Sequence, residues 1–244
     1  MNSIPDTNSS SPRDILANLI SPVRNQSRVI WTAIIGIVIV FTVGLLIRHS
    51  HFDLAVVQYL NDHHHGTIGS ITNAVYKFFG PLYAILGVVV VTGIIVAVSR
   101  NLRVGSTFAA TIAATWLSMA AVKLIVHRLR PDPSLLSFPF NPAQIDASYP
   151  SGHTAFITAL VVTLFLGVAI NRRWLVAFIG GLFIILVGLS VIVDGIHFPS
   201  DVIASVIWGI VVAPFARMLW VSVVLRTIDK MQSRRNQNTQ KNSS

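Results

Sequence analysis

Two cations lie near the end of an apolar stretch and could act together on an anion. Lys123 and Arg130 are seven residues apart, which is two turns of an α-helix, so both side chains point to nearly the same helical face. A lysine inside an otherwise apolar span is energetically costly and usually marks function. The alternative is an interfacial pair whose long side chains reach out to water. From these residues alone both interpretations remain open.

A second polar block begins the next apolar stretch, with the sequence Tyr-Pro-Ser-Gly-His-Thr over residues 149–154. Proline, serine and glycine are typical of a turn that leads into a helix. The free N–H groups of a helix start bind anions, and Ser151 and His153 would add a hydroxyl donor and a titratable imidazole. An ordinary serine cap followed by an interfacial histidine is the alternative, and it is favoured for this block in isolation.

The third block, residues 194–201, has the sequence Asp-Gly-Ile-His-Phe-Pro-Ser-Asp. Asp201 lies four residues after His197, so it can accept a hydrogen bond from one ring nitrogen and leave the other free as a nucleophile or base. In the alternative, Asp201 is a charge at a helix N-terminus and His197 a loop residue. Pro199 is expected in the first helical turn, and Asp194 is expected to be polar lining near the membrane interface.

The elements that carry these blocks are expected to be membrane-spanning helices. The chain is 53% hydrophobic and 11% charged, with a mean hydropathy of +0.68, whereas soluble domains have about one-quarter charged residues. A span needs about 20 apolar residues. The expected fold is therefore all-α, a bundle of six transmembrane helices at approximately 29–47, 81–99, 105–126, 152–170, 174–193 and 202–222.

The two ends of the chain are polar. Residues 1–28 are expected to be a disordered tail, and residues 223–244 a basic tail, on either side of a membrane domain over residues 29–222. The first span follows 28 polar residues and no small-residue cleavage site comes after it, so we expect it to be retained in the mature protein.

The distribution of basic residues predicts the orientation of the spans. Six spans place both tails and the loops at 100–104 and 171–173 on one side, and that side holds thirteen of the eighteen Lys and Arg residues. Positively charged loops face the cytoplasm, so both termini are expected there and the protein is expected in the cell membrane. The three polar blocks then all lie at the extracytoplasmic face, where their side chains can converge.

Other features of the sequence exclude some kinds of site. Residues 52–79 are expected outside the membrane. The apolar side chains of Phe52, Leu54, Val56, Val57 and Leu60 have approximately helical spacing, which predicts a helix lying on the outer membrane surface. The three adjacent histidines that follow this helix, His63, His64 and His65, cannot all face one metal ion from regular structure, and a solvated loop is the preferred interpretation. The absence of cysteine excludes thiolate chemistry. The net charge of +9 is explained by cytoplasmic loops and tails, so nucleic-acid binding is not expected.

Together the three blocks resemble the sequence pattern of the membrane-bound type 2 phosphatidic acid phosphatase family. That pattern is Lys, six residues, Arg-Pro; then Pro-Ser-Gly-His; then Ser-Arg, five residues, His, three residues, Asp. The blocks occur in the family's order and at the expected span ends, and the resemblance covers roughly residues 29–222. The matching positions are Lys123, Arg130 and Pro131, then Pro150 through His153, then Ser190, His197 and Asp201.

The resemblance implies a phosphatase that uses no metal ion or other cofactor. His197 would attack phosphorus to form a phosphohistidine, with Asp201 orienting the ring, and His153 would protonate the leaving group. Water would then hydrolyse the intermediate. The charge on the phosphoryl oxygens would be stabilised by Lys123, Arg130, Ser151 and the N–H group of Gly152.

One position departs from the family pattern, because Val191 stands where the third block has arginine. Arg128 or His127 could supply the missing cation, or either could face lipid head groups. The departure leaves open a non-catalytic or weakly active lipid-phosphate-binding protein on the same fold. A small transporter is a third interpretation, but its site would be expected near the middle of the membrane.

The expected substrate is a lipid phosphate monoester or a polyprenyl diphosphate held in the membrane. Phosphatidic acid, phosphatidylglycerol phosphate, a polyprenyl diphosphate and a sugar-lipid phosphate remain alternatives, and no sequence feature indicates an oligomeric state.

Overall fold

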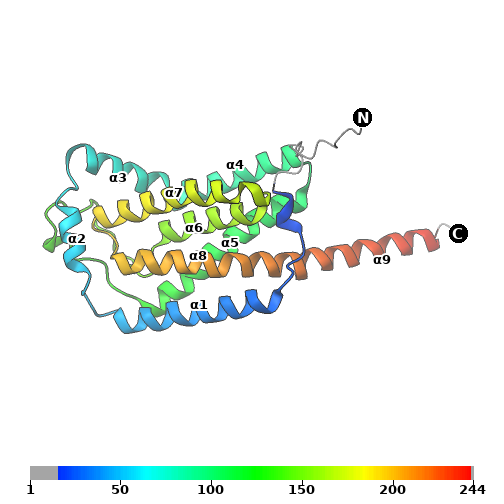
Figure 1. Ribbon diagram of the computed structural model, residues 1–244, viewed down its shortest axis with the longest axis horizontal. Helices are drawn as coiled ribbons and strands as arrows, with labels where there is room; N and C mark the ends of the chain where they lie inside the picture. The colour runs from blue at the N-terminus through cyan, green and yellow to red at the C-terminus, as the bar shows by residue number, and fades with distance from the viewer. Residues whose placement is uncertain (1–15, 243–244) are drawn as a thin grey trace, which may run out of the picture.

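The computed structural model describes residues 16–242, and this part of the chain is helical without strands. Five helices are long and apolar enough to cross a membrane. They are α1 (Gln26–Ile47), α4 (Pro81–Ser99), α5 (Leu102–Val126), α7 (Arg173–Val193) and α8 (Pro199–Leu219). They lie roughly along one direction (Figure 1). Large apolar side chains on α1 and α4, such as Leu46 and Val89, are exposed.

The expected fourth span is the helix α6 (Gly152–Gly167), which has 16 residues and is shorter than the five candidate spans. It packs against α5, α7 and α8, and its residues 154–159 are all buried. Close approach to α6 requires glycine, since a Cβ atom at Gly209 of α8 would lie 2.5 Å from Thr158 Cγ2. The described residues therefore form a helical bundle with five candidate membrane spans, and the crossing of a membrane by α6 stays a prediction.

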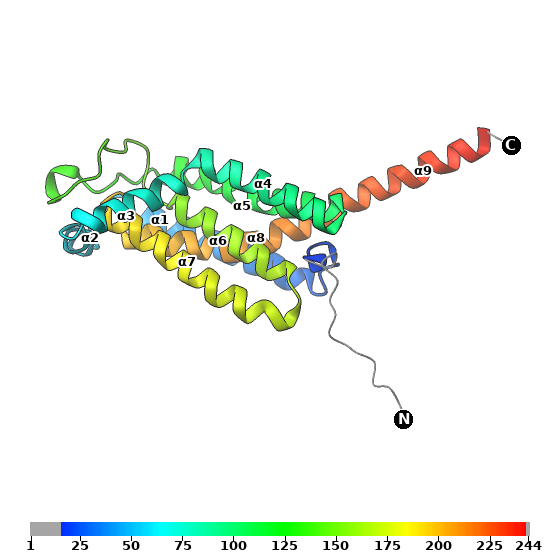
Figure 2. The ribbon, with the colours of Figure 1, turned by 90° about the horizontal axis from the view of Figure 1, so that it is seen from above.

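The stretch 52–79 contains two short helices, α2 (Leu54–Asn61) and α3 (Gly66–Phe78). Helix α2 coincides with the helix expected before the histidine triplet, and α3 was not expected. They lie at one end of the bundle, together with the loop that connects α5 to α6 (Figure 1). The start of α1 lies at the opposite end (Figures 1 and 2). The position of α2 and α3 on a membrane surface stays a prediction.

The sequence on either side of the expected membrane domain also forms structure. Residues 1–15 of the expected N-terminal tail lie outside the described part of the chain, but Ala17–Ile20 form a 3-10 helix and Leu19 is fully buried. Arg217 of α8 donates hydrogen bonds to the carbonyl oxygens of Asn18, Leu19 and Ser21 at 2.6–2.8 Å. The packed part of the protein thus extends to the N-terminal side of residue 29.

The C-terminal residues continue α8 as helix. A π-helical segment, Trp220–Leu225, joins α8 to α9 (Arg226–Asn242), which extends beyond the bundle (Figures 1 and 2). Arg103, at the start of α5, forms an ion pair with Asp229 of α9. The expected basic tail over residues 223–244 is therefore helical through Asn242.

Candidate active site

One cavity, of about 280 Å³, brings the three polar blocks together at the end of the bundle that carries α2 and α3. Five of the residues singled out in the sequence line it: Lys123, Arg130, Gly152, His153 and His197. Ser151 and Asp201 lie behind this wall with fully buried side chains. The remaining lining residues are Tyr76, Phe79, Pro81, Trp116, Gln144 and Asp146.

His197 is positioned by the turn between α7 and α8. Gly195 has a φ of +72°, and a Cβ atom there would collide with Leu136 Cδ1, so this left-handed residue needs glycine. The N–H groups of Ile196 and His197 then donate to the carbonyl oxygen of Val191 at 3.1 and 3.2 Å. These bonds fix the backbone from which the His197 side chain enters the cavity.

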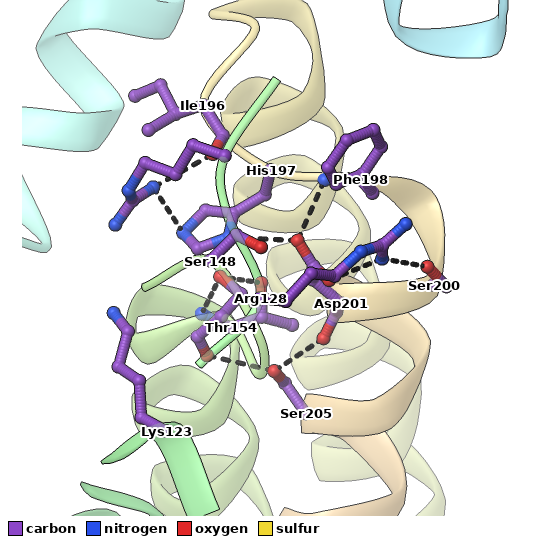
Figure 3. A network of polar contacts seen from close by, with 12 residues as sticks. Lys123, Arg128, Ser148, Thr154, Ile196, His197, Phe198, Ser200, Asp201 and Ser205 are labelled. Carbon is purple, nitrogen blue, oxygen red and sulfur yellow. Dashed lines mark hydrogen bonds and ion pairs between the residues drawn. The ribbon is translucent and has the colours of Figure 1, made fainter. Parts of the chain in front are cut away.

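The ring of His197 has one nitrogen toward Asp201 and one toward the cavity (Figure 3). Its Nδ1 atom lies 3.5 Å from Asp201 Oδ2, and its Nε2 atom lies 3.2 Å from Nη1 of Arg130. Because arginine is only a donor, Nε2 is the acceptor and the ring proton belongs on Nδ1, facing the carboxylate. The free electron pair of Nε2 therefore faces the cation that lines the cavity.

The surroundings of His197 favour its neutral form. The ring is 1% exposed, and this burial, with the positive charges of Arg130 and Lys123, lowers the pKa of His197 well below its usual value. A neutral imidazole is the nucleophilic form of histidine.

Asp201 is also held by hydrogen-bond donors other than His197. It lies in the first turn of α8, where its Oδ2 atom accepts the N–H of Phe198 at 2.9 Å, as an acidic residue at this position of a capping box does. Its Oδ1 atom accepts a hydrogen bond from Arg128 at 2.8 Å. The carboxylate is thus fixed against the ring it faces.

Arg128 does not line the cavity, although the sequence left it as a candidate for the missing third-block cation. Its guanidinium is 1% exposed and contacts Asp201 (Figure 3). On its other side, Nη2 lies 2.9 Å from Asp53 Oδ1. It also donates to Ser200 Oγ at 2.6 Å and stacks over the Phe198 ring at 3.9 Å. Val191 is fully buried and does not line the cavity either.

Asp146, which sequence reasoning did not single out, connects the two cations of the first block. Its Oδ2 atom lies 2.6 Å from Lys123 Nζ, and its Oδ1 atom lies 2.8 Å from Arg130 Nη2. Partial burial raises the pKa of Asp146, but the Lys123 hydrogen bond and the charges of Arg130 and Lys123 outweigh this, so the pKa is below its usual value. This carboxylate is ionised where the two cations face the cavity.

His153 lies in the first turn of α6, after Ser151, whose Oγ atom accepts the N–H of Thr154 at 3.4 Å as the helix cap. The imidazole stacks on the ring of Tyr76 from α3, with ring centroids 4.2 Å apart. Within the described part of the chain, His153 Nε2 has no hydrogen-bond partner. Sequence reasoning missed Tyr76, which no pattern relates to the second block.

The histidine triplet and Asp194 lie outside the cavity. His64 is buried rather than solvated: its Nδ1 atom lies 2.5 Å from the carbonyl oxygen of Phe138, and its Nε2 atom lies 3.3 Å from Asp194 Oδ1. Asp194 is fully buried, and burial raises its pKa to about 6. This pair joins the α2–α3 turn to the end of α7.

Two apolar grooves flank α4 and each shares a wall residue with the cavity. The groove between α4 and α6 has a volume of about 130 Å³ and shares Phe79 with the cavity. The groove between α4 and α5 has a volume of about 210 Å³ and shares Trp116. Apolar surface therefore leads from the sides of α4 to the rim of the charged cavity.

Comparison with known proteins shows which family this arrangement resembles. Residues 104–224 match the model of the PAP2 superfamily. An undecaprenyl-diphosphatase of Sulfolobus acidocaldarius is 29% identical over 123 residues, which are 49% of this chain and 56% of that protein. The chain thus matches little more than half the length of this curated relative.

Two solved structures share the fold. A PAP2-type phosphatidylglycerolphosphate phosphatase from Bacillus subtilis has a TM-score of 0.63 at 15% identity, covering 79% of this chain and 98% of that one. LpxE of Aquifex aeolicus has a TM-score of 0.54 at 20% identity, covering 67% and 93%. The match over residues 104–224 contains all three polar blocks, and this segment of the chain, an integral membrane protein, is a domain of the PAP2 superfamily.

Proposed function

We propose that the protein is a phosphatase that hydrolyses a lipid phosphate monoester or a polyprenyl diphosphate, with His197 as the nucleophile. The observation that carries the proposal is the setting of this one ring: Nδ1 faces the Asp201 carboxylate at 3.5 Å, and Nε2 lies 3.2 Å from Arg130 at the cavity. A buried neutral imidazole is suited to attack phosphorus when a carboxylate faces one ring nitrogen and cations lie near the other.

In the proposed reaction, His197 Nε2 forms a bond to phosphorus as the bond from phosphorus to the leaving oxygen breaks. His153 donates a proton to that oxygen, and the product alcohol or lipid phosphate departs. Asp201 stabilises the positive charge that develops on the ring. Water then attacks the phosphohistidine and gives a proton back to His153 as the bond from phosphorus to Nε2 breaks. This step releases inorganic phosphate and restores both imidazoles.

The phosphoryl oxygens are proposed to bind Lys123, Arg130 and the free N–H groups at the start of α6, including that of Gly152. The N-terminus of a helix favours an anion, and Ser151 caps this helix. These groups supply positive charge where negative charge increases in the transition state, so the reaction is proposed to need no metal ion. Asp146 also contacts both cations.

A lipid substrate is favoured because apolar grooves adjoin a small charged cavity. A volume of about 280 Å³ admits a phosphate or diphosphate head group but not a long chain. The tail would lie along α4, where Phe79 and Trp116 connect the grooves with the cavity. The names of the related proteins, an undecaprenyl-diphosphatase and a phosphatidylglycerolphosphate phosphatase, describe lipid substrates of this kind.

The site is proposed to face the extracytoplasmic side of the cell membrane, with both termini in the cytoplasm and α6 as the sixth span. The basic-residue distribution supports this orientation. The cavity and the start of α1 lie at opposite ends of the bundle, as the orientation requires (Figure 1).

The test is phosphate release by the purified protein from a panel of lipid phosphates and diphosphates. His197→Ala should abolish release, because no other group in the described cavity is placed as the nucleophile. When the reaction of the wild-type protein is quenched without acid, the protein should carry phosphate on histidine. Addition of EDTA should leave turnover unchanged. His63→Ala, at an exposed histidine of the triplet, is the matched control and should retain full activity. Phosphate release by the His197→Ala protein at the wild-type rate would exclude the nucleophile.

A further inference from the structure

The cations proposed to hold phosphate already have an anion between them. The two oxygen atoms of Asp146 lie 2.6 Å from Lys123 Nζ and 2.8 Å from Arg130 Nη2. A carboxylate therefore uses the donors that two phosphoryl oxygens would need. All three side chains line the same cavity as His197.

The ion pairs of Asp146 differ from the buried ion pairs of Arg128. The two acids that contact Arg128, Asp53 and Asp201, are 6% and 0% exposed, and each also accepts a backbone N–H group. The Asp146 side chain is 56% exposed, whereas Lys123 and Arg130 are 19% and 9% exposed. Among the hydrogen bonds of the described residues, the Asp146 carboxylate accepts none from the backbone. It is the solvent-side partner and the easier one to displace.

The loop does not depend on this carboxylate for its place. Arg130 Nε also donates to the backbone carbonyl of Asp146 at 3.0 Å. Two residues later, Ser148 donates its N–H to the carbonyl of Arg128 at 2.8 Å and its hydroxyl to the carbonyl of Leu129 at 3.1 Å. The Asp146 side chain can therefore leave the cations while the backbone stays.

We propose that Asp146 is a specificity-determining residue, an internal competitor that a substrate's phosphate must displace from Lys123 and Arg130. The inference rests on the proposed function, which identifies Lys123 and Arg130 as the phosphate ligands. With Val191 supplying no third cation, one carboxylate neutralises half of the positive charge that these two cations supply.

A competing carboxylate discriminates between head groups by their charge. An anion with more charge and more oxygen atoms displaces it more readily, because each charge-assisted hydrogen bond it forms is stronger than the one it replaces. A lipid diphosphate is therefore favoured over a phosphate monoester, and the product, inorganic phosphate, is held weakly. The competitor thus favours a diphosphate substrate and limits product inhibition.

The experiment measures binding of inorganic phosphate and of vanadate to the purified full-length protein, by calorimetry and by inhibition of turnover. Asp146→Asn keeps the shape but removes the charge, and it should tighten binding of both anions roughly tenfold, the effect of about one charge-assisted hydrogen bond. It should also reduce the preference for a diphosphate over a monophosphate substrate. Asp146→Glu keeps a competing carboxylate and should bind phosphate with an affinity closer to wild type.

Two controls separate the possible failures. Asp132→Asn changes an exposed acid of the same loop that is hydrogen-bonded to Ser134, and it should leave phosphate affinity unchanged. Arg130→Gln should greatly weaken phosphate binding; if it does not, the proposed phosphate site itself is wrong. If Arg130→Gln weakens binding but Asp146→Asn also weakens it or leaves it unchanged, the cations are phosphate ligands and Asp146 is not a competitor. Thermal unfolding without phosphate verifies that each variant is folded.

Discussion

Arg128 and Arg130 are two residues apart in the sequence but have different partners. Arg130 lines the cavity and contacts Asp146 and His197. Arg128 lies inside the protein and forms ion pairs with Asp201 (Figure 3) and with Asp53. It therefore acts on the proposed nucleophile only through Asp201, as a positioning residue.

Replacement of Arg128 by methionine should strongly destabilise the protein. Arg128→Met keeps much of the side-chain length but leaves two buried carboxylates without their cation, and breaking a buried ion pair costs about 3–5 kcal/mol. Thermal unfolding in a single detergent measures the loss. The double variant Arg128→Met/Asp53→Asn removes one of the stranded charges and should be more stable than Arg128→Met alone. Equal stability of the two variants would contradict the assigned pairing.

The sequence predicted which residues of the three blocks come together, because span ends on one side of a membrane share a plane. Lys123, Arg130, His153 and His197 indeed line one cavity. The roles of Asp146 and Arg128 could not be predicted, since both depend on irregular backbone between α5 and α6. The only signal was an acid five residues before Ser151, which no periodic pattern distinguishes from a solvated loop charge.

Helix α6 is enclosed by α5, α7 and α8, and its neighbours approach it at glycines. In α7, a Cβ atom at Gly180 would lie 2.9 Å from Val161 Cγ2 of α6, whereas one at Gly181 would meet no atom within 4 Å. Gly180 therefore packs closely against α6, whereas the adjacent Gly181 has open space beside it.

Alanine substitutions at these two glycines should have opposite effects on stability. Gly180→Ala forces α7 away from α6, and overpacking of this kind costs about 1–3 kcal/mol. Gly181→Ala meets open space and gains helix propensity, which is worth at most about 1 kcal/mol. Thermal unfolding midpoints in the same detergent should fall for Gly180→Ala and stay level or rise for Gly181→Ala. A larger loss for Gly181→Ala would show that the α6–α7 contact is placed incorrectly.

Apolar segments were predictable as helices because their length and composition are local properties. The burial of the turn between α2 and α3 was not, because it depends on distant residues. His64 lies in this turn and contacts the carbonyl of Phe138, 74 residues away, and buried Asp194 at the end of α7. A contact of this range leaves no mark in the local sequence around the histidine triplet.

At the scale of the whole molecule, the cavity and α9 lie at opposite ends (Figures 1 and 2). The chain contains no cysteine, so one introduced cysteine is a unique reporter. Ser137→Cys, in the exposed part of the loop between α5 and α6, should react with a membrane-impermeant maleimide in intact cells. Ser233→Cys, in α9, should react only after permeabilisation.

The two positions are controls for each other because both side chains are exposed. Reaction of Ser137→Cys only in permeabilised cells, with Ser233→Cys labelled from outside, would reverse the orientation and place the site in the cytoplasm. The fold and the proposed competition between Asp146 and phosphate do not depend on that result.

The proposed position of the substrate tail in the grooves beside α4 determines which concentration the protein would respond to. Both grooves are lined by apolar side chains of the bundle and adjoin the cavity through Phe79 and Trp116. A substrate whose tail lies there would be sampled from the surrounding bilayer, so its mole fraction among the lipids would govern the rate rather than its amount per volume. Inert lipid would then act as a diluent, and abundant chains that fit the grooves would act as competitors. The rate of hydrolysis would follow the composition of the membrane.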